Sequence, residues 1–125
     1  MKPKPTNSEL EILQIIWKNG ASTVREINEQ LSKDKGSKIG YTTTLKLMQI
    51  MHEKGLLERE TSSRTHVYKA LVTRSKTSQN ILNSLIDTVF NGSAAQLVMQ
   101  ALSNNKSSRE EIEMIKKYLD DLDKK

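Results

Sequence analysis

The sequence predicts a mostly α-helical protein with one small β-hairpin, in two parts that divide after residue 73. Three observations support this fold class. In most segments, apolar residues recur every three or four positions, which places them on one face of a helix. At the expected starts of three helices a Thr or Ser precedes a Glu by three positions, which is the spacing of a helix capping box. After Gly55 the pattern changes to a period of two, as in a strand.

Composition limits the size of the core and the classes of function. The chain has 125 residues, enough for one ordinary domain or for a small domain with an appendage. Its hydrophobic content is 35%, with one Phe and one Trp, so we expect a compact but thin core. The absence of cysteine excludes disulfides, thiolate metal sites and a cysteine nucleophile. No signal-peptide pattern and no run of about 18 apolar residues occurs, which predicts a cytoplasmic protein without membrane insertion.

The positive charge is concentrated in the first part of the chain. Residues 1–75 contain 13 Lys and Arg against 8 Asp and Glu, whereas residues 76–125 contain 7 of each. The entire excess of +5 therefore lies in the N-terminal part. A polyanion is a natural partner for such a segment, although a surplus of this size also occurs in ordinary proteins.

The first helix is expected from Thr6 to about Lys18. Thr6 and Glu9 have capping-box spacing at its start, and Asn-Gly at residues 19–20 ends it. Trp17 lies on the apolar face of this helix, where we expect it to pack in a core rather than to bind a ligand.

A second helix is expected from Val24 to about Ser32. Thr23 and Glu26 repeat the capping-box spacing at its start. A polar loop at residues 33–38 follows and leads into the next helix.

The third helix, within residues 40–57, has two chemically different faces. One face is expected in the core: Thr44, Leu47, Met48 and Met51. The other face offers only hydroxyl, amide and ammonium groups: Thr42, Thr43, Lys46 and Gln49. Such groups suit the base edges and phosphates of a DNA major groove, although an ordinary solvated face has a similar composition. Gly55 is expected to end this helix, and three short helices in this order match a helix-turn-helix arrangement.

A β-hairpin is expected directly after the third helix. Residues 57–61 alternate, residues 62–65 form a turn-rich tip, and residues 66–70 form the returning strand. A two-stranded hairpin attached to a helix-turn-helix is a winged helix. Arg64 at its tip is expected to contact a phosphate or a minor groove, the alternative being an arginine that is merely exposed.

The C-terminal part, residues 74–125, is expected to form three short helices, because breaks at 91–93 and 104–107 interrupt its apolar stripes. Ser108 and Glu111 have the spacing to cap the last helix. Its apolar residues have the 3-4-3 spacing of a coiled-coil seam: Ile112, Ile115, Leu119 and Leu122. About 50 residues in three short helices bury too little apolar surface alone, so we expect this region to pack on the winged helix or on a second chain, of which a second chain is favoured.

No constellation for catalysis or metal binding is evident. His52 and His66 lie far apart in sequence and lack metal-ligand spacing. The five glycines form no phosphate-binding loop, and no nucleophile-elbow motif occurs. We therefore expect no enzymatic activity, no cofactor and no metal.

Five segments together resemble the penicillinase and methicillin-resistance repressor family, which also includes copper-transport repressors. They are 13–17 (LQIIW), 23–27 (TVREI), 41–48 (YTTTLKLM), 54–57 (KGLL) and 63–68 (SRTHVY). No single segment is specific. The Tyr-Thr-Thr helix, the Lys-Gly-Leu turn and the Arg-x-x-x-Tyr wing are quite specific in combination.

This resemblance implies a dimeric repressor that binds a palindromic DNA operator of β-lactamase, antibiotic-resistance or related genes. It implies an N-terminal winged helix whose recognition helix enters the major groove, which places Thr42, Thr43 and Lys46 at DNA and Arg64 on the wing. It also implies a C-terminal dimerisation region with an apolar interface: Leu82, Leu85, Phe90, Leu97, Val98, Ile112, Ile115 and Leu119.

In this family a membrane-bound sensor metalloprotease signals the antibiotic, and the repressor is then cut in its dimerisation region. The staphylococcal repressors are cut at an Asn–Phe bond that follows Leu-Val-x. Here Leu97, Val98 and Met99 precede Gln100 and Ala101, so the position matches and the bond differs. The copper branch has C-terminal cysteine pairs, and the absence of cysteine argues against copper sensing.

Two other interpretations stay open from the sequence. A winged-helix regulator that senses a small ligand would need a pocket, for which few aromatic residues are present. A winged helix that serves as a protein-interaction module without DNA binding is the other alternative. The polar face of the third helix and the charge asymmetry favour DNA. Binding that weakens steeply with salt would discriminate, because phosphate contacts release counterions.

Overall fold

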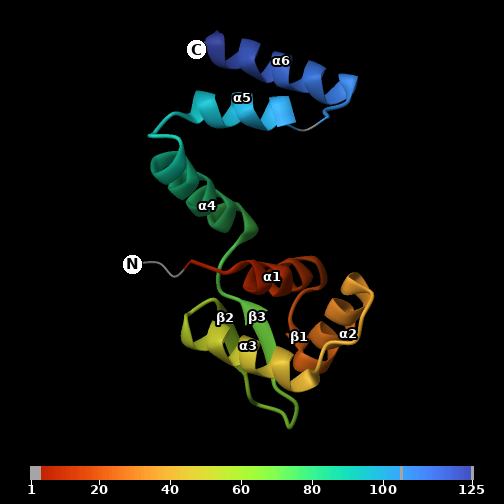
Figure 1. Cartoon of the computed structure of the whole chain (residues 1–125). Helices are drawn as coiled ribbons and strands as arrows, with labels where there is room; N and C mark the ends of the chain where they lie inside the picture. Colours follow the sequence, from red (N-terminus) through yellow and green to blue (C-terminus); the bar gives the residue numbers. More distant parts are fainter. Residues whose placement is uncertain (1–3, 105, 125) are drawn as a thin grey trace. The chain divides into compact units, whose positions relative to one another are not determined.

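The computed structural model describes residues 4–104 and 106–124, and confirms the predicted fold class of helices with a small antiparallel sheet (Figure 1). The elements are α1 (Asn7–Asn19), β1 (Ser22–Thr23), α2 (Val24–Lys35), α3 (Tyr41–Glu53), β2 (Leu57–Glu60), β3 (Val67–Ala70), α4 (Arg74–Val89), α5 (Ala94–Asn104) and α6 (Arg109–Asp123). Residue contacts divide the chain into two units, with the division between Ile81 and Leu82. This point lies inside α4, later than the boundary expected after residue 73.

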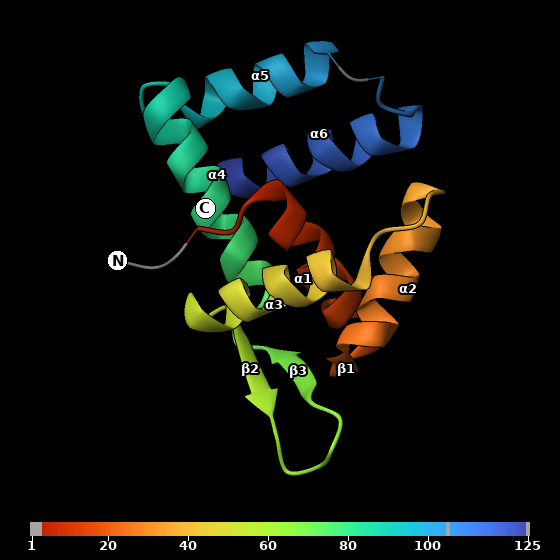
Figure 2. The same ribbon diagram turned by 60° about the horizontal axis from the view of Figure 1, so that its bottom comes forward.

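The first unit is a winged helix. Its helices α1, α2 and α3 pack against one another, and α3 leads into a three-stranded antiparallel sheet of order β1-β3-β2 (Figure 2). In the hairpin, Leu57 pairs with Ala70 and Glu60 with Val67. The predicted two-stranded wing was incomplete, because Ser22–Thr23 pairs with β3 as a third strand. A strand of two residues has no periodicity of its own, so it exists only through this tertiary pairing.

The core of the first unit draws on all three helices and on the hairpin. Its buried apolar residues are Ile12, Leu13, Ile15, Ile16, Val24, Ile27, Leu31, Met48, Met51, Leu56, Leu57 and Tyr68. Trp17 packs against this core, as predicted, and its indole Nε1 donates a hydrogen bond of 2.9 Å to the Val72 carbonyl. The guanidinium of Arg74, in the first turn of α4, lies 5.5 Å from the centre of the Trp17 ring. The first turns of α4 therefore belong to the first unit.

Helix boundaries follow the predicted capping boxes. Thr6, Thr23 and Ser108 each accept a hydrogen bond from the backbone N–H three residues later, and the Glu at that position bonds back to the cap. The second helix continues to Lys35, beyond the expected end at Ser32. Gly36 ends it in a left-handed conformation with φ of 68°. The polar composition of residues 33–38 predicted a loop and did not reveal that the helix continues as far as this glycine.

The second unit has little buried apolar surface. No described residue of α5 or α6 is buried, and many large apolar side chains are exposed: Leu82, Leu85, Val89, Val98, Met99, Met114, Tyr118, Leu119 and Leu122. Within residues 4–104 and 106–124, none of the helices combines the length and hydrophobicity needed to cross a bilayer.

Candidate nucleic-acid interface

The start of α3 is fixed to α2 by one asparagine side chain. The Asn28 Nδ2 donates to the Ile39 carbonyl at 2.9 Å, to the Gly40 carbonyl at 3.4 Å and to the Thr44 Oγ1 at 2.9 Å. The Ser32 hydroxyl accepts from the Ile39 N–H at 3.0 Å. These bonds hold the turn between α2 and α3, so the direction in which α3 leaves the turn is set by α2.

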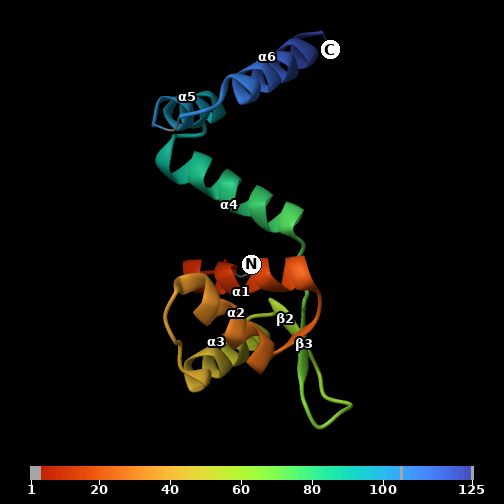
Figure 3. The same cartoon turned by 90° about the vertical axis from the view of Figure 1, so that its right-hand side faces the viewer.

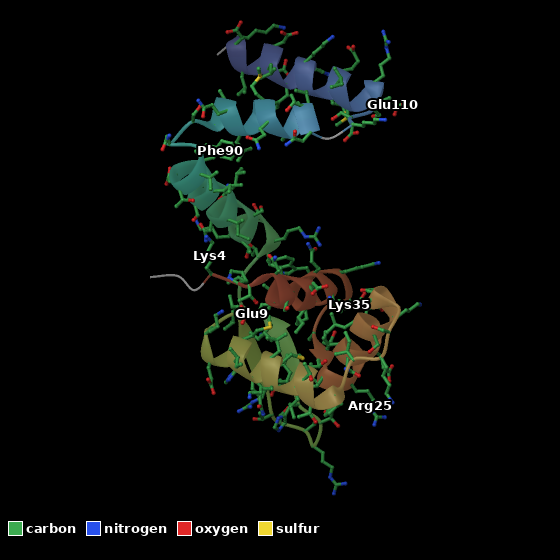
Figure 4. All side chains as sticks on the ribbon, in the orientation of Figure 1. Lys4, Glu9, Arg25, Lys35, Phe90 and Glu110 are labelled. Carbon is green, nitrogen blue, oxygen red and sulfur yellow. The ribbon has the colours of Figure 1, made fainter. Side chains whose placement is uncertain are left out.

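The end of α3 is fixed to α1 by an ion pair between a buried glutamate and a half-buried lysine. The Lys54 Nζ lies 2.7 Å from the Glu9 Oε1, and the Glu9 side chain is 2% exposed. The same oxygen accepts a hydrogen bond of 2.8 Å from the Thr6 N–H. Burial raises the pKa of Glu9, but the hydrogen bonds from Lys54 and Thr6 outweigh it, and the pKa lies below its ordinary value. Glu9 is therefore charged at neutral pH, and Figure 4 labels it on α1.

The predicted core face of α3 is confirmed. Thr44, Met48 and Met51 are buried, and Leu47 is half-buried against the core. The opposite face has four exposed polar side chains, as the helical period requires: Thr42, Thr43, Lys46 and Gln49. Within the described part of the chain, none of these four side chains makes a hydrogen bond or an ion pair. The first turn of α3 lacks an acidic residue, and its one acidic residue, Glu53, is exposed in the last turn, four positions after Gln49.

Arg64 lies in the hairpin loop and is exposed. Figures 1 and 3 show this loop at the opposite end of the first unit from α1. Arg64 lines a groove of about 490 Å³ together with Tyr41 at the start of α3. The fold thus brings the wing and α3 to one surface.

The same groove contains residues that sequence reasoning did not assign to the site. Arg25 in the first turn of α2, Tyr41 and His66 all line it, next to Arg64. The sequence offered only weak indications for two of them: Arg25 lies two positions after the capping residue Thr23, and Tyr41 directly precedes the threonine pair of α3. Their proximity to Arg64 arises only when the sheet and the helices assemble.

The residues predicted for dimerisation and cleavage all lie in the second unit. Leu82, Leu85, Val98 and Leu119 are exposed, whereas Phe90, Leu97, Ile112 and Ile115 are half-buried. Gln100 and Ala101 lie inside α5 with exposed side chains. The bond between them is therefore part of a helix.

No metal centre competes with this interpretation in the described residues, which include no group of three or more His, Asp or Glu side chains arranged to hold an ion.

Comparison of the sequence with protein families matches the family described as penicillinase repressor over residues 5–121. The penicillinase repressor of Bacillus licheniformis is 27% identical over 121 residues, which cover 95% of this chain and 91% of the relative. The methicillin resistance regulatory protein MecI of Staphylococcus aureus (strain N315) is 28% identical over 120 residues, which cover 91% of each chain.

Two solved structures support the fold. The DNA-binding domain of the repressor BlaI, determined in solution, matches with a TM-score of 0.52 and 25% identity, over 60% of this chain and 89% of that chain. RosR of H. salinarum matches with a TM-score of 0.55 over 97% of this chain and 96% of that chain, and its 15% identity shows the fold alone. Because the family match spans nearly the entire sequence, the chain belongs to the penicillinase repressor family.

Proposed function

We propose that the chain is a dimeric transcriptional repressor that binds a palindromic DNA operator through α3. The observation that supports this most is the exposed polar face of α3, formed by Thr42, Thr43, Lys46 and Gln49 without partners in the described chain. Hydroxyl, amide and ammonium groups are the donors and acceptors that read base edges and bind phosphates. Asn28 and Lys54 anchor both ends of this helix, so the face is presented in a fixed orientation.

The relatives suggest the genes that are controlled. Their names assign them to the repression of penicillinase and to the regulation of methicillin resistance. We therefore propose β-lactamase or related antibiotic-resistance genes as targets. Because a repressor acts on the chromosome or plasmid that carries its operator, the proposal includes a cytoplasmic location. The proposal assigns the chain no enzymatic role.

Dimerisation through the second unit is supported by its exposed apolar surface. Leu82 is 45% exposed, Leu85 is 41% exposed and Leu119 is 57% exposed. Contiguous apolar side chains in water are unfavourable, at about 25 cal/mol for each Å². A second copy of the chain is the partner we propose, because two linked winged helices match the symmetry of a palindrome.

A finer part of the proposal concerns induction. By resemblance to its family, the repressor is inactivated by proteolysis near Gln100–Ala101 after a membrane-bound sensor metalloprotease responds to the antibiotic. Cleavage there would separate α6, including its Ile112 and Leu119, from the rest of the chain. An intact chain in induced cells with derepressed target genes would contradict this part of the proposal.

The test of DNA binding is a mobility shift with the DNA upstream of the protein's own gene, across a salt series. Lys46→Ala should weaken binding about tenfold or more, since a lost base or phosphate contact costs about 1–3 kcal/mol. Lys18→Ala is the matched control: Lys18 is also an exposed lysine, but it lies on α1, away from the wing (Figure 1). Equal affinity of both variants would show that the polar face of α3 is not the reading surface. Salt-insensitive or absent binding of the wild type would favour a protein-interaction module instead.

A further inference from the structure

The groove between the wing and the two helices of the helix-turn-helix has the composition of an anion site. Two arginines, one histidine and two threonines line it beside two tyrosines and two aliphatic residues, and its lining includes no carboxylate. The lining residues are Arg25, Arg64, His66, Thr23, Thr65, Tyr41, Tyr68, Val24 and Leu45. Its volume of about 490 Å³ is in the range of small-molecule pockets, but those are predominantly apolar. A cationic and polar lining favours a phosphate over an organic ligand.

The two guanidinium groups are available to a ligand. Within the described residues, neither Arg25 nor Arg64 makes a hydrogen bond or an ion pair, and both are exposed. Three lysines of the first unit are paired with carboxylates: Lys35 with Glu11, Lys54 with Glu9 and Lys69 with Glu58. The two arginines of the groove, like Lys46 on α3, have no such partner in the described residues. Guanidinium groups bind phosphate oxygens in a bidentate manner, which ammonium groups do not.

The position of the groove identifies the source of the phosphate. Tyr41 lines the groove and directly precedes Thr42, the first residue of the polar face of α3. Arg64 and His66 reach the groove from the hairpin loop. When a helix lies in the major groove and a wing lies beyond it, one strand of the DNA backbone passes between the two. That strand would pass over this groove.

We propose that Arg25, Tyr41, Arg64 and His66 form a clamp for one backbone phosphate in each operator half-site. This inference rests on the proposed function and extends it with three residues, Arg25, Tyr41 and His66. Phosphate contacts position a protein on DNA without reading sequence. The clamp therefore sets how α3 is oriented in the major groove, and it contributes equally to operator and to unrelated DNA.

The test uses the full-length protein with Arg25→Ala and the matched control Lys33→Ala, which removes an exposed positive charge from the other end of α2. Affinity for DNA is measured across a salt series on the operator and on a scrambled duplex. Arg25→Ala should weaken binding to both duplexes by a similar factor, about tenfold. It should also reduce the slope of log K against log salt by about two per dimer, one for each lost phosphate contact.

A second measurement locates the phosphate. Operator duplexes are prepared with a neutral methylphosphonate at one backbone position at a time. One position in each half-site should weaken wild-type binding, and on that duplex Arg25→Ala and Arg64→Ala should cause little further loss. The clamp would be overturned if Arg25→Ala bound DNA with the same affinity and the same salt slope as the wild type. It would also be overturned if Arg25→Ala and Arg64→Ala became insensitive to neutralisation of two different phosphates. If wild-type protein binds no DNA, the proposed function itself fails and the clamp fails with it.

Discussion

At the residue scale, Glu9 links the start of α1 to the end of α3. It caps α1 through Thr6 and pairs with Lys54 just after α3. Glu9→Gln retains the capping geometry, because Gln also serves in a capping box, but removes the charge. We expect the free energy of unfolding to fall by about 1–3 kcal/mol at neutral pH, the value of a charged hydrogen bond in a buried setting.

The pH dependence of this loss follows from the lowered pKa of Glu9. Because the carboxyl binds a proton less readily in the folded state, the unfolded state binds more protons as the pH falls. The stabilisation is fully present above the ordinary pKa of a glutamate and is lost as the pH falls through the lowered pKa. Urea unfolding of wild type and Glu9→Gln should therefore differ at neutral pH and converge in acid.

Glu11→Gln is the control for this measurement. Glu11 lies on the same helix and pairs with Lys35 at 3.1 Å, but the two side chains are 43% and 47% exposed. Exposed pairs contribute about 0–1 kcal/mol, so this variant should stay close to wild type. Equal losses in the two variants, or a difference between Glu9→Gln and wild type that does not change with pH, would contradict the role assigned to Glu9.

Individual residues of the site were predictable only where they share one helix. The outward placement of Thr42, Thr43 and Lys46 follows from the helical period once the core face is known. Arg25 and His66 could not be found in the same way. Arg25 comes from α2, and no sequence spacing relates it to Arg64. His66 lies two positions after Arg64 in the hairpin loop, but no pattern in the sequence marked it as part of the groove.

At the scale of elements, local signals predicted the helices and nonlocal contacts were missed. The three capping boxes were visible because each involves residues only three positions apart. The strand β1 was missed because Ser22 and Thr23 become a strand only by pairing with Tyr68 and Val67. The extension of α2 to Lys35 was missed because residues 33–35 are polar and show no helical pattern. Gly36 ends α2, just as Gly20 ends α1.

Because the Gln100–Ala101 bond lies in α5, we expect it to be cleaved slowly in the folded protein. The Gln100–Ala101 bond lies inside α5, whereas proteases bind extended chain, so cleavage requires local unfolding. A non-specific protease should cut this bond more slowly in the protein than in a free peptide of residues 96–105. Ala95→Gly leaves the residues beside the bond unchanged and should accelerate its cleavage about two- to fivefold, because Gly destabilises a helix by up to about 1 kcal/mol.

Mass spectrometry of the fragments measures this rate at the single bond. The matched control is Ala21→Gly, the same substitution between α1 and β1 in the first unit. It should leave the rate at Gln100–Ala101 unchanged. A wild-type rate equal to that of the free peptide would show that α5 does not protect the bond.

At the scale of the whole molecule, charge and apolar surface are divided between the two units. The net charge of +5 comes from residues 1–75, whereas the large exposed apolar side chains are concentrated in the second unit. The charge division was predictable, because net charge is a sum over the sequence. The exposed apolar surface was expected because three short helices are too small to bury their own apolar faces. What covers the exposed apolar surface was not predictable, because an apolar pattern does not specify whether a second copy of the chain or another protein packs on it.

If the second unit joins two winged helices, it strengthens DNA binding by linking the two DNA-binding units and not by contacting the DNA itself. Joining two binding sites raises the affinity for a double target by about 10²–10⁴. Leu85→Asp places an unpaired charge on the proposed apolar interface and should convert the dimer to a monomer, as measured by analytical ultracentrifugation. Asn83→Asp adds the same charge on an exposed polar position of α4 and should remain dimeric.

The two variants then separate linkage from DNA contact in one titration. For a duplex with a single half-site, we expect Leu85→Asp, Asn83→Asp and wild type to bind with equal affinity per winged helix, because α3 and the wing are unchanged. For the full palindrome, Leu85→Asp should bind about 100-fold more weakly than Asn83→Asp, which is the low end of the linkage effect. If the Leu85→Asp variant is monomeric in solution but binds the palindrome as tightly as the wild type, the dimer forms on the DNA through another surface. A loss on the half-site as well would show that the substitution disturbs the winged helix itself.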